Sequence, residues 1–372
     1  MNKIKIIFNS HLSEKIGSVR IPQISIKSAF EKFNEFDVYK NIYNRYEQFD
    51  VAILHGDEDE ILKAREQNPN IIIGVAKPHH ERVVHPLFHR FDMKSFLYQI
   101  RMFRNDDNSE FMRKRNEKLK AANFVIADSI HLKHLFELQG INSIYIKLLE
   151  RYSPVSIKNN LQNDNEIIFG YHGNSMHFIE SMPYIFPALN SLSKEFSVTL
   201  KVVSNINSLK KLPKTNFNIE LFEYSYPEIY SILSDIDIGL VPNQIGYRNV
   251  FFETILTKFG GYFWKTDRAY DLLFRYKQSV NAGRAFVFSQ LRKPFIGCPI
   301  PELLSTFGSD MEDYFPYSKE TWEYSILKLS KDKSEQLRII DFLNKKVDDE
   351  LTIDIEALKL KNLILSYFGG HK

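Results

Sequence analysis

Four polar residues with the chemistry of an anion site lie close together in the stretch KQSVNAGRAFVFSQL: Lys277, Ser279, Asn281 and Arg284. We predict a helix over 280–291 with Ser279 as its N-cap, which places the other three around the positive end of the helix dipole. Asn281 and Arg284 are three residues apart and therefore share a face. Two cations, an amide and a helix N-terminus together would bind a diphosphate. The alternative is that Lys277 and Arg284 are solvated surface charges.

A second candidate loop is FGYHGN (169–174), which separates an apolar strand from a predicted helix over 175–193. Gly170 and Gly173 let a ligand approach the backbone closely, and the free N–H groups of the following helix favour an anion. The glycine spacing is not that of a dinucleotide-binding turn, and the Gly-Lys-Ser/Thr ending of a P-loop is absent. The alternative is an ordinary tight turn between a strand and a helix.

Histidines in the loops after strands could supply a general base, because imidazole titrates near neutral pH. His79 lies in KPHHE (77–81), directly after a predicted strand, and we predict that it deprotonates an acceptor hydroxyl. His55, which ends the preceding strand, is a rival candidate. His172 could contact the acceptor or a phosphate. The alternative for His79 is an exposed loop residue without a catalytic role.

The first half of the chain alternates strands and helices that would hold these loops. The predicted strands are 3–8, 49–55, 70–76, 124–129 and 143–149, and the predicted helices are 26–36, 57–67 and 131–141. We expect Asp128 and Ser129 to cap the last of these helices. Apolar runs of about four to six residues, each followed by a helix, indicate a parallel sheet buried on both faces.

A polar, Asn-rich stretch over 151–166 interrupts the alternation, which then restarts. The sequence therefore predicts an α/β protein of two Rossmann-like domains facing across a cleft, with ligands beyond the carboxyl ends of the strands. The expected boundaries are 1–153 for an acceptor domain, 154–345 for a donor domain, and 346–372 for a C-terminal helix that packs back on the first domain. The predicted second-half strands are 167–171, 198–204, 219–225, 238–242 and 294–298, with helices at 175–193, 227–237, 280–291 and from 319 onward.

Residues 167–302 resemble the donor-binding half of GT-B glycosyltransferases, in particular family 4-like enzymes. The strand–YHGN–helix entry, YPEIYSILSDIDIGLVPN (226–243), and K-x-S-x-N-x-x-R followed by LRKPFIGCPIPE (291–302) carry the resemblance. It implies a GT-B architecture and a loop after a middle strand of the donor half that holds the nucleobase, with Glu223 and Tyr224 near the nucleoside. The implied donor-binding residues are Gly173, Asn174, Ser204, Glu223, Tyr224, Ser279, Asn281 and Glu302, with Lys277 and Arg284 neutralising the diphosphate.

The sequence departs from that family at two places. The paired glutamates of the E-x7-E element are absent, since Ser279 and Val287 stand where they are expected. Arg292 and Lys293 replace the usual glycine before the strand that resembles Pro-Val-Ile. Retention or inversion at the sugar therefore stays open.

We expect a glycosyltransferase that moves a sugar from a nucleotide-diphosphate sugar to an acceptor hydroxyl on a surface glycan or a lipid-linked saccharide. The donor is a co-substrate, and no cofactor or metal is expected, since DEDE (57–60) reads as a helix start and Asp235 and Asp237 as a strand junction. Cations and helix dipoles would then stabilise the leaving group. Two alternatives are a nucleotide-sugar epimerase, which would require several cleft carboxylates, and a non-catalytic binding or scaffold subunit.

Composition limits the partners and the compartment. The net charge of +3 over 372 residues gives no field that would favour nucleic acid. One cysteine, Cys298, fits a reducing compartment, and no signal peptide or membrane span is evident, so we expect a cytoplasmic protein. The aromatic stretch 244–276 could form a helical hairpin that covers the acceptor, docks a second subunit or rests on lipid, or it could pack on its own domain. The basic run 113–120 could face anionic lipid or solvent. The oligomeric state stays open.

Overall fold

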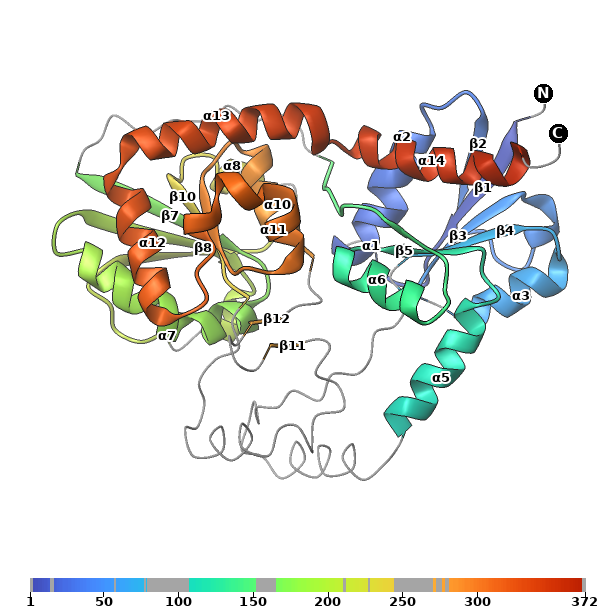
Figure 1. The fold of residues 1–372 in the computed structure, drawn as a ribbon, viewed down its shortest axis with the longest axis horizontal. Coiled ribbons are helices and arrows are strands. Elements are labelled where there is room, and N and C mark those ends of the chain that lie inside the picture. Colours follow the sequence, from blue (N-terminus) through green and yellow to red (C-terminus); the bar gives the residue numbers. More distant parts are fainter. Residues whose placement is uncertain are drawn as a thin grey trace. The chain divides into compact units, whose positions relative to one another are not determined.

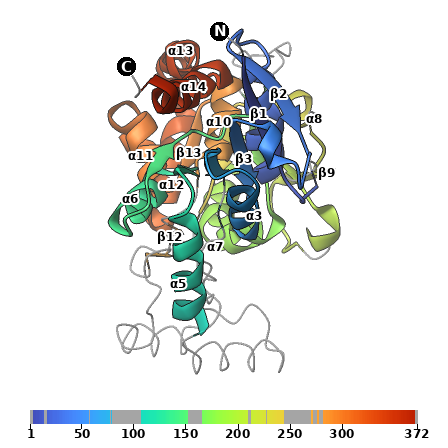
Figure 2. The same cartoon turned by 90° about the vertical axis from the view of Figure 1, so that its right-hand side faces the viewer.

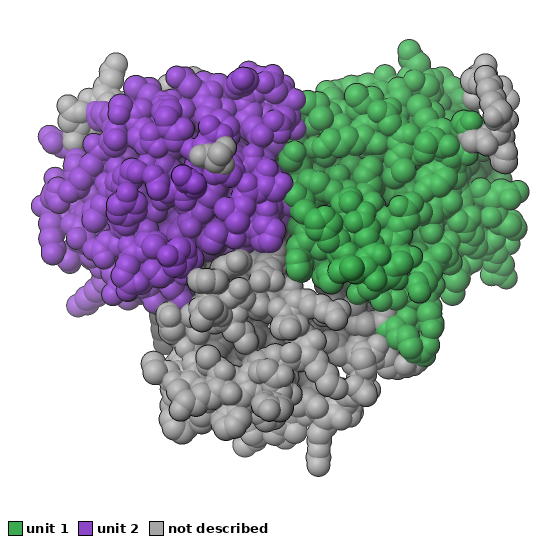
Figure 3. Space-filling view, in the orientation of Figure 1, with its two compact units in different colours: residues 1–151, 352–372 green, residues 152–351 purple. Residues whose placement is uncertain are grey.

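The computed structural model describes residues 3–13, 17–56, 58–76, 78, 107–151, 165–209, 212–226, 228–243, 270–271, 276–277 and 281–369. These residues form two compact units (Figure 3). The N-terminal unit comprises Met1–Arg151 and Thr352–Lys372, and the C-terminal unit comprises Tyr152–Leu351. Residues 352–372 thus group with the first 151 residues, while the sequence-based boundaries lay at 153 and 345.

The N-terminal unit is a six-stranded parallel sheet with strand order β2-β1-β3-β4-β5-β6 (Figure 1). Figure 2 shows β1, β2 and β3 side by side. Its strands are β1 (Ile4–Asn9), β2 (Phe36–Lys40), β3 (Val51–His55), β4 (Ile72–Ala76), β5 (Phe124–Ala127) and β6 (Ser143–Tyr145). Its helices are α1 (Gly17–Arg20), the π-helical turn η1 (Ile21–Ser25), α2 (Ile26–Phe30), the 3-10 turn η2 (Tyr46–Gln48), α3 (Asp59–Gln67), α5 (Asp107–Leu119), α6 (Ile130–Leu138) and α14 (Ile353–Gly369).

Apolar side chains bury both faces of this sheet, as the sequence predicted. On β3, Ile53 belongs to one core cluster and the adjacent Leu54 to the other, because successive side chains of a strand point to opposite faces. Helix α14 packs against α2, and its Leu360 lies in the first cluster. Ser129 caps α6, as predicted, by accepting a hydrogen bond from Leu132 N.

The C-terminal unit contains a five-stranded parallel sheet with order β13-β10-β7-β8-β9. Its strands are β7 (Glu166–His172), β8 (Ser197–Ser204), β9 (Asn218–Glu223), β10 (Ile238–Val241) and β13 (Phe295–Gly297), and a separate antiparallel pair joins β11 (Tyr270–Asp271) to β12 (Tyr276–Lys277). Its helical elements are α7 (Ser175–Leu192), η3 (Ile206–Leu209), α8 (Glu228–Ile232), α10 (Gly283–Gln290), α11 (Pro301–Phe307), η5 (Gly308–Asp310), η6 (Glu312–Tyr314), α12 (Lys319–Lys331) and α13 (Lys333–Glu350). The two parallel sheets with their helices confirm the predicted α/β class and the two Rossmann-like sheets.

Three sequence-based element assignments need correction. The helix predicted over 26–36 ends at Phe30, and Phe36 begins β2, a strand that the sequence did not predict. The last strand of the first sheet stops at Tyr145 and not at residue 149. Helix α10 begins at Gly283 with Ala282 as its N-cap residue, so Ser279 does not cap it.

Most of the aromatic stretch 244–276 lies outside the described residues, and its described parts belong to β11 and β12. The basic run falls partly on α5, where Arg113 and Lys114 are exposed but Arg115 is buried. Within the described parts of the chain, every helix is too short or too polar to cross a membrane.

Candidate anion site in the C-terminal unit

Phe169 to His172 of the predicted glycine loop form the end of β7, and Gly173 and Asn174 follow them at the carboxyl edge of the second sheet. Gly173 has a φ of +124°, a conformation that other residues rarely adopt. A Cβ at this position would lie 3.2 Å from Cδ of Arg284. Glycine is therefore needed here both for its backbone angle and for the close approach of the arginine.

Hydrogen bonds between the strand ends hold this loop. Gly173 N donates to Val203 O over 3.0 Å, and Ser204 Oγ donates to Gly173 O over 2.7 Å. Tyr224 N donates to Ser204 O over 3.1 Å, so the carboxyl ends of β7, β8 and β9 are tied together. Ser204 is buried and supports the loop. Glu223 accepts from Ile206 N over 3.1 Å and is exposed.

Arg284 reaches this loop from the first turn of α10. Its Nη2 donates to Oδ1 of Asn243, which follows β10, and its guanidinium lies 5.6 Å from the centre of the Tyr171 ring. Asn243 is itself held by its own N–H, which donates to Cys298 Sγ over 2.8 Å. Among the described residues, Arg284 makes no ion pair with a carboxylate, and the buried atoms Arg284 Nη1 and Asn243 Nδ2 have no hydrogen-bond partner.

Tyr171 and His172 at the end of β7 lie beneath the loop. Burial raises the pKa of Tyr171 to about 12, against the opposing effect of Arg284, so its hydroxyl stays protonated and donates to Asn174 O over 2.7 Å. His172 Nε2 lies 3.2 Å from Arg284 O, and because a carbonyl only accepts, this nitrogen carries the proton.

Burial also keeps His172 neutral at ordinary pH. Burial lowers its pKa to about 4, a hydrogen bond to the Arg284 carbonyl raises it and the Arg284 charge lowers it further. Its ring also packs edge-on against Phe288 of α10, with centroids 5.3 Å apart. These contacts tie the first turn of α10 to β7. The predicted contact of His172 with an acceptor or phosphate stays a prediction.

The start of α10 presents backbone donors near Arg284. Asn281 Oδ1 accepts from Gly283 N over 3.0 Å and so takes one of the first free N–H groups. Asn281 therefore accepts a hydrogen bond from a free N–H group at the start of the helix, the role that the sequence analysis predicted for Ser279.

The structure brings only some of the predicted residues together. His172, Gly173, Ser204 and Arg284 contact one another, and Asn174 adjoins them as an exposed residue of the same loop. Glu302 is buried in the first turn of α11. Lys277 lies in β12, but its side chain, Ser279 and His79 are outside what the structure describes.

Asn243 and Tyr171 are the site residues that sequence reasoning missed. Asn243 directly follows the apolar IGLVP strand, and a polar residue at the carboxyl end of a buried strand is the signal that marks it. Tyr171 lies between the two glycines of the loop. Asn243 and Tyr171 form a cluster with Arg284 beside Gly173. The cluster combines a permanent positive charge, amide and backbone N–H donors, and a glycine without a side chain, and this combination binds anions.

No protein-family model and no curated protein matches the chain by sequence. Among solved structures, HepE from Anabaena, in complex with UDP and glucose, is similar with a TM-score of 0.59 and 11% identity over 98% of this chain and 100% of that one. A putative UDP-N-acetylglucosamine 2-epimerase from Listeria monocytogenes is similar with a TM-score of 0.52 and 12% identity over 100% and 98% of the two chains.

TarM from S. aureus, solved as a mutant in complex with fondaparinux, α-GlcNAc-glycerol and UDP, is similar with a TM-score of 0.51 and 12% identity over 84% of this chain. The match covers 55% of TarM, so the present chain spans about half of that protein. At these identities the likeness shows the fold alone: the chain has the GT-B fold.

Proposed function

We propose that this protein is a glycosyltransferase that moves a sugar from a nucleotide-diphosphate sugar to an acceptor hydroxyl. The observation that carries the proposal is Arg284, a half-buried arginine set against Gly173 at the carboxyl edge of the second sheet, whose buried Nη1 has no hydrogen-bond partner among the described residues. Ligands of open parallel sheets bind at this edge. An anionic ligand would complete the hydrogen bonding of Arg284.

Glycosyl transfer would use this charge in its bond-breaking step. As the bond between the sugar carbon and the diphosphate oxygen breaks, negative charge builds on the leaving group. Arg284 stays charged at every physiological pH, and the first N–H groups of α10 add their dipole. Charge stabilisation of this kind in a water-poor site is a large contribution to catalysis. We propose that it suffices without a metal ion.

The similar structures support the donor class. HepE was solved with UDP and glucose, and TarM with UDP and α-GlcNAc-glycerol. We therefore propose a UDP-sugar or a related nucleotide sugar as donor, a glycan or lipid-linked saccharide as acceptor, and a cytoplasmic reaction in surface glycan or glycolipid synthesis, with or without peripheral membrane contact.

A nucleotide-sugar epimerase is the second candidate, since the Listeria protein matches over nearly the full length of both chains. Both reactions begin by breaking the bond to the diphosphate, so Arg284 would serve either. They differ in product: an epimerase releases an altered sugar without an acceptor. A non-catalytic subunit would bind the nucleotide sugar and turn over none.

A binding and turnover panel tests the proposal. Thermal stability and calorimetric affinity are measured with UDP, GDP, CMP and their common sugars, and release of the nucleotide is then followed with and without octyl glucosides as acceptors. We expect one nucleotide sugar to bind and to transfer its sugar. Epimerised sugar without acceptor would favour the second candidate, and binding without turnover would favour the scaffold. Absence of binding across the panel would overturn the proposal.

A further inference from the structure

Arg292, directly after α10, is one of the two residues that replace the glycine expected from the resemblance. Its φ is +55°, a left-handed conformation that favours glycine. In the described parts of the chain, the other residues with a side chain and a positive φ are asparagines, which tolerate this conformation better. Arg292 N donates to Ser289 O over 2.8 Å. Lys293 N donates to Phe288 O over 2.9 Å, the second of the two bonds that end a helix at such a residue. The backbone here thus suits glycine, but the chain carries an arginine.

The side chain of Arg292 reaches α13. Its Nη2 donates to Oδ1 of Asp348 over 2.6 Å, near the end of that helix. Helix α10 packs against α13 (Figure 1). The last residues of α13 are the acidic Asp348, Asp349 and Glu350, which lie at the negative end of the helix dipole. A cation is favourable at this position, and a glycine in place of Arg292 would not supply it.

Stability alone explains this arginine poorly. A left-handed backbone costs a residue with a side chain at least as much as an ion pair to an exposed partner contributes, and the side chain of Asp348 is 71% exposed. The buried Nη1 of Arg292 also has no hydrogen-bond partner among the residues that the structure describes, which adds a further cost. The contact with Asp348 is therefore better explained by what it does to the position of α10.

Helix α10 carries the candidate anion site at its other end. Arg284 lies in its first turn and Arg292 follows its last, so a two-turn helix, about 12 Å long, joins them. The middle of this helix lies close to β10, because a Cβ at Gly239 would be 2.5 Å from the ring of Phe288. A helix this short moves as one body. The contact of Arg292 with Asp348 therefore fixes the position of Arg284 along the helix axis.

We propose that Arg292 is a positioning residue of the candidate anion site: its contact with Asp348 fixes α10 along its axis and so places Arg284 for a diphosphate. The inference rests on the proposed binding of a diphosphate at Arg284, and not on the transfer of a sugar. A guanidinium binds phosphate oxygens through directed hydrogen bonds. A small shift of α10 would lengthen these bonds and weaken the binding of the ligand.

The test measures the binding of UDP, GDP and inorganic pyrophosphate by calorimetry, and the melting temperature of each ligand-free protein. Arg292→Gly removes the side chain, and Asp348→Ala removes the same contact without a change in α10. For each probe that binds the wild-type chain, we expect Kd to rise about 2- to 30-fold in both variants, the range for residues that do not contact the ligand. The melting temperature of Arg292→Gly should be unchanged or higher, because glycine adopts a positive φ without strain.

A double variant and a matched control separate positioning from a general effect. Arg292→Gly combined with Asp348→Ala should bind the probes no more weakly than either single variant, because both changes remove one contact. Lys346→Met removes a different ion pair of α13, in which Lys346 Nζ lies 2.7 Å from Glu350 Oε1 within the same helix. This variant should leave Kd unchanged.

The outcomes distinguish this inference from the proposed function. Unchanged Kd values in both single variants, an equal rise in Lys346→Met, or a double variant weaker than both would overturn the positioning role. A melting temperature of Arg292→Gly that falls together with affinity would assign a structural role to Arg292 instead. Weaker pyrophosphate binding in both variants of a chain that turns over no nucleotide sugar would support the positioning role and overturn the transferase. A wild-type chain that binds none of the probes would overturn both.

Discussion

Each edge of the C-terminal sheet holds a cation, and the surroundings of the two cations differ. Lys293 is buried, whereas Arg284 is half-buried with its Nη1 inside the protein. At the amino edge, Lys293 precedes β13 and faces Asp237 and Asp235, which precede β10. Burial lowers the pKa of Lys293 to about 8 even so. At the carboxyl edge, Arg284 is paired with the neutral side chain of Asn243 and with no carboxylate among the described residues.

The difference indicates which edge is built for a ligand. A buried lysine can release its proton when burial disfavours the charge, and carboxylates nearby limit the cost. A guanidinium cannot release its proton, so Arg284 must stay charged where it lies. A permanent cation with a buried nitrogen and no acid partner among the described residues is stabilised when an anion binds, and this supports the proposed diphosphate position at the carboxyl edge.

The largest expected effect is a loss of affinity for the nucleotide diphosphate when Arg284 is replaced. Arg284→Met should weaken nucleotide-diphosphate binding by about 2–4 kcal/mol, since it removes one partner of a buried charged contact, which is roughly 30- to 1,000-fold in Kd. The stability of the ligand-free protein should be unchanged or higher, because a partly buried charge with no carboxylate partner among the described residues is lost. Calorimetric titration and chemical denaturation measure the two effects.

Lys293→Met is the matched control for this variant, because Lys293 is a buried cation of the same unit at the opposite edge. It should leave donor affinity unchanged. Equal losses of affinity in both variants would show that the cation at the carboxyl edge has no special role in donor binding.

The next effect concerns pH and His172. Its pKa lies at about 4 in the folded protein and near 6.5 when unperturbed. Between these values the unfolded chain binds a proton that the folded chain does not, so stability should fall as the pH decreases from 6.5 to 4, by up to about 3 kcal/mol, and then level off. The contribution of His172 to stability should therefore be largest above pH 6.5.

His172→Gln should remove this dependence, because the glutamine amide can donate to the Arg284 carbonyl without titrating. Denaturation curves of both proteins at pH 7.5 and 4.5 provide the measurement. A slope that persists in the variant would assign the pH dependence to another group.

Gly173→Ala tests the close approach of the loop to Arg284. A φ of +124° suits only glycine, and the new Cβ would press on Arg284 Cδ at 3.2 Å. We expect a loss of about 2 kcal/mol in the free energy of unfolding, together with weaker donor binding. Gly140→Ala is the matched control, because Gly140 also has a positive φ, +71°, and an added Cβ would have no atom within 4 Å of it. This variant therefore measures the backbone contribution alone. Equal stability losses and unchanged donor binding would show that Arg284 is not displaced.

The parallel sheets followed from the sequence because buried strands are continuous apolar runs, as in VAILH (51–55) and IIGVA (72–76). Strand β2 was missed because it is an edge strand with polar Asp37 and Lys40, and its periodicity does not differ from the end of a helix. Such strands are specified by their pairing with a neighbour, here β1.

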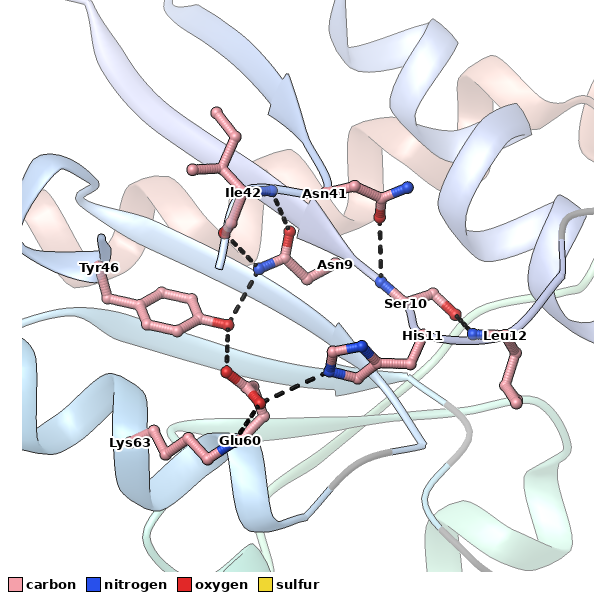
Figure 4. A network of polar contacts seen from close by, with 9 residues as sticks. All are labelled: Asn9, Ser10, His11, Leu12, Asn41, Ile42, Tyr46, Glu60 and Lys63. Carbon is pink, nitrogen blue, oxygen red and sulfur yellow. Dashed lines mark hydrogen bonds and ion pairs between the residues drawn. The ribbon is translucent and has the colours of Figure 1, made fainter. Parts of the chain in front are cut away.

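The sequence predicted some residues of the candidate anion site but not the contacts between them. Arg284 and Gly173 stand out by type and spacing, whereas their contact depends on where β7 and α10 meet in space. Glu60 was read as an ordinary acidic first turn, since the sequence does not show that Tyr46, fourteen positions earlier, donates to it. Asn9, which ends the first strand, and His11, two residues later, were the available signal for the polar contacts around Glu60 and Tyr46 (Figure 4).

The smallest expected effect decides what Ser204 does at the carboxyl edge. Its Oγ donates to Gly173 O over 2.7 Å inside the protein, so Ser204→Ala should cost about 0.5–1.5 kcal/mol of stability. Ser289→Ala is the matched control, because Ser289 is equally buried and donates to Ala285 O over 2.9 Å on α10. If Ser204 only supports the loop, both variants should lose similar stability and change donor affinity less than about threefold, since a loop held by its other bonds moves little. A loss of affinity above about tenfold in Ser204→Ala alone would instead place its hydroxyl on the donor, as the resemblance to GT-B enzymes implied, because about 1.4 kcal/mol is the size of a direct hydrogen bond.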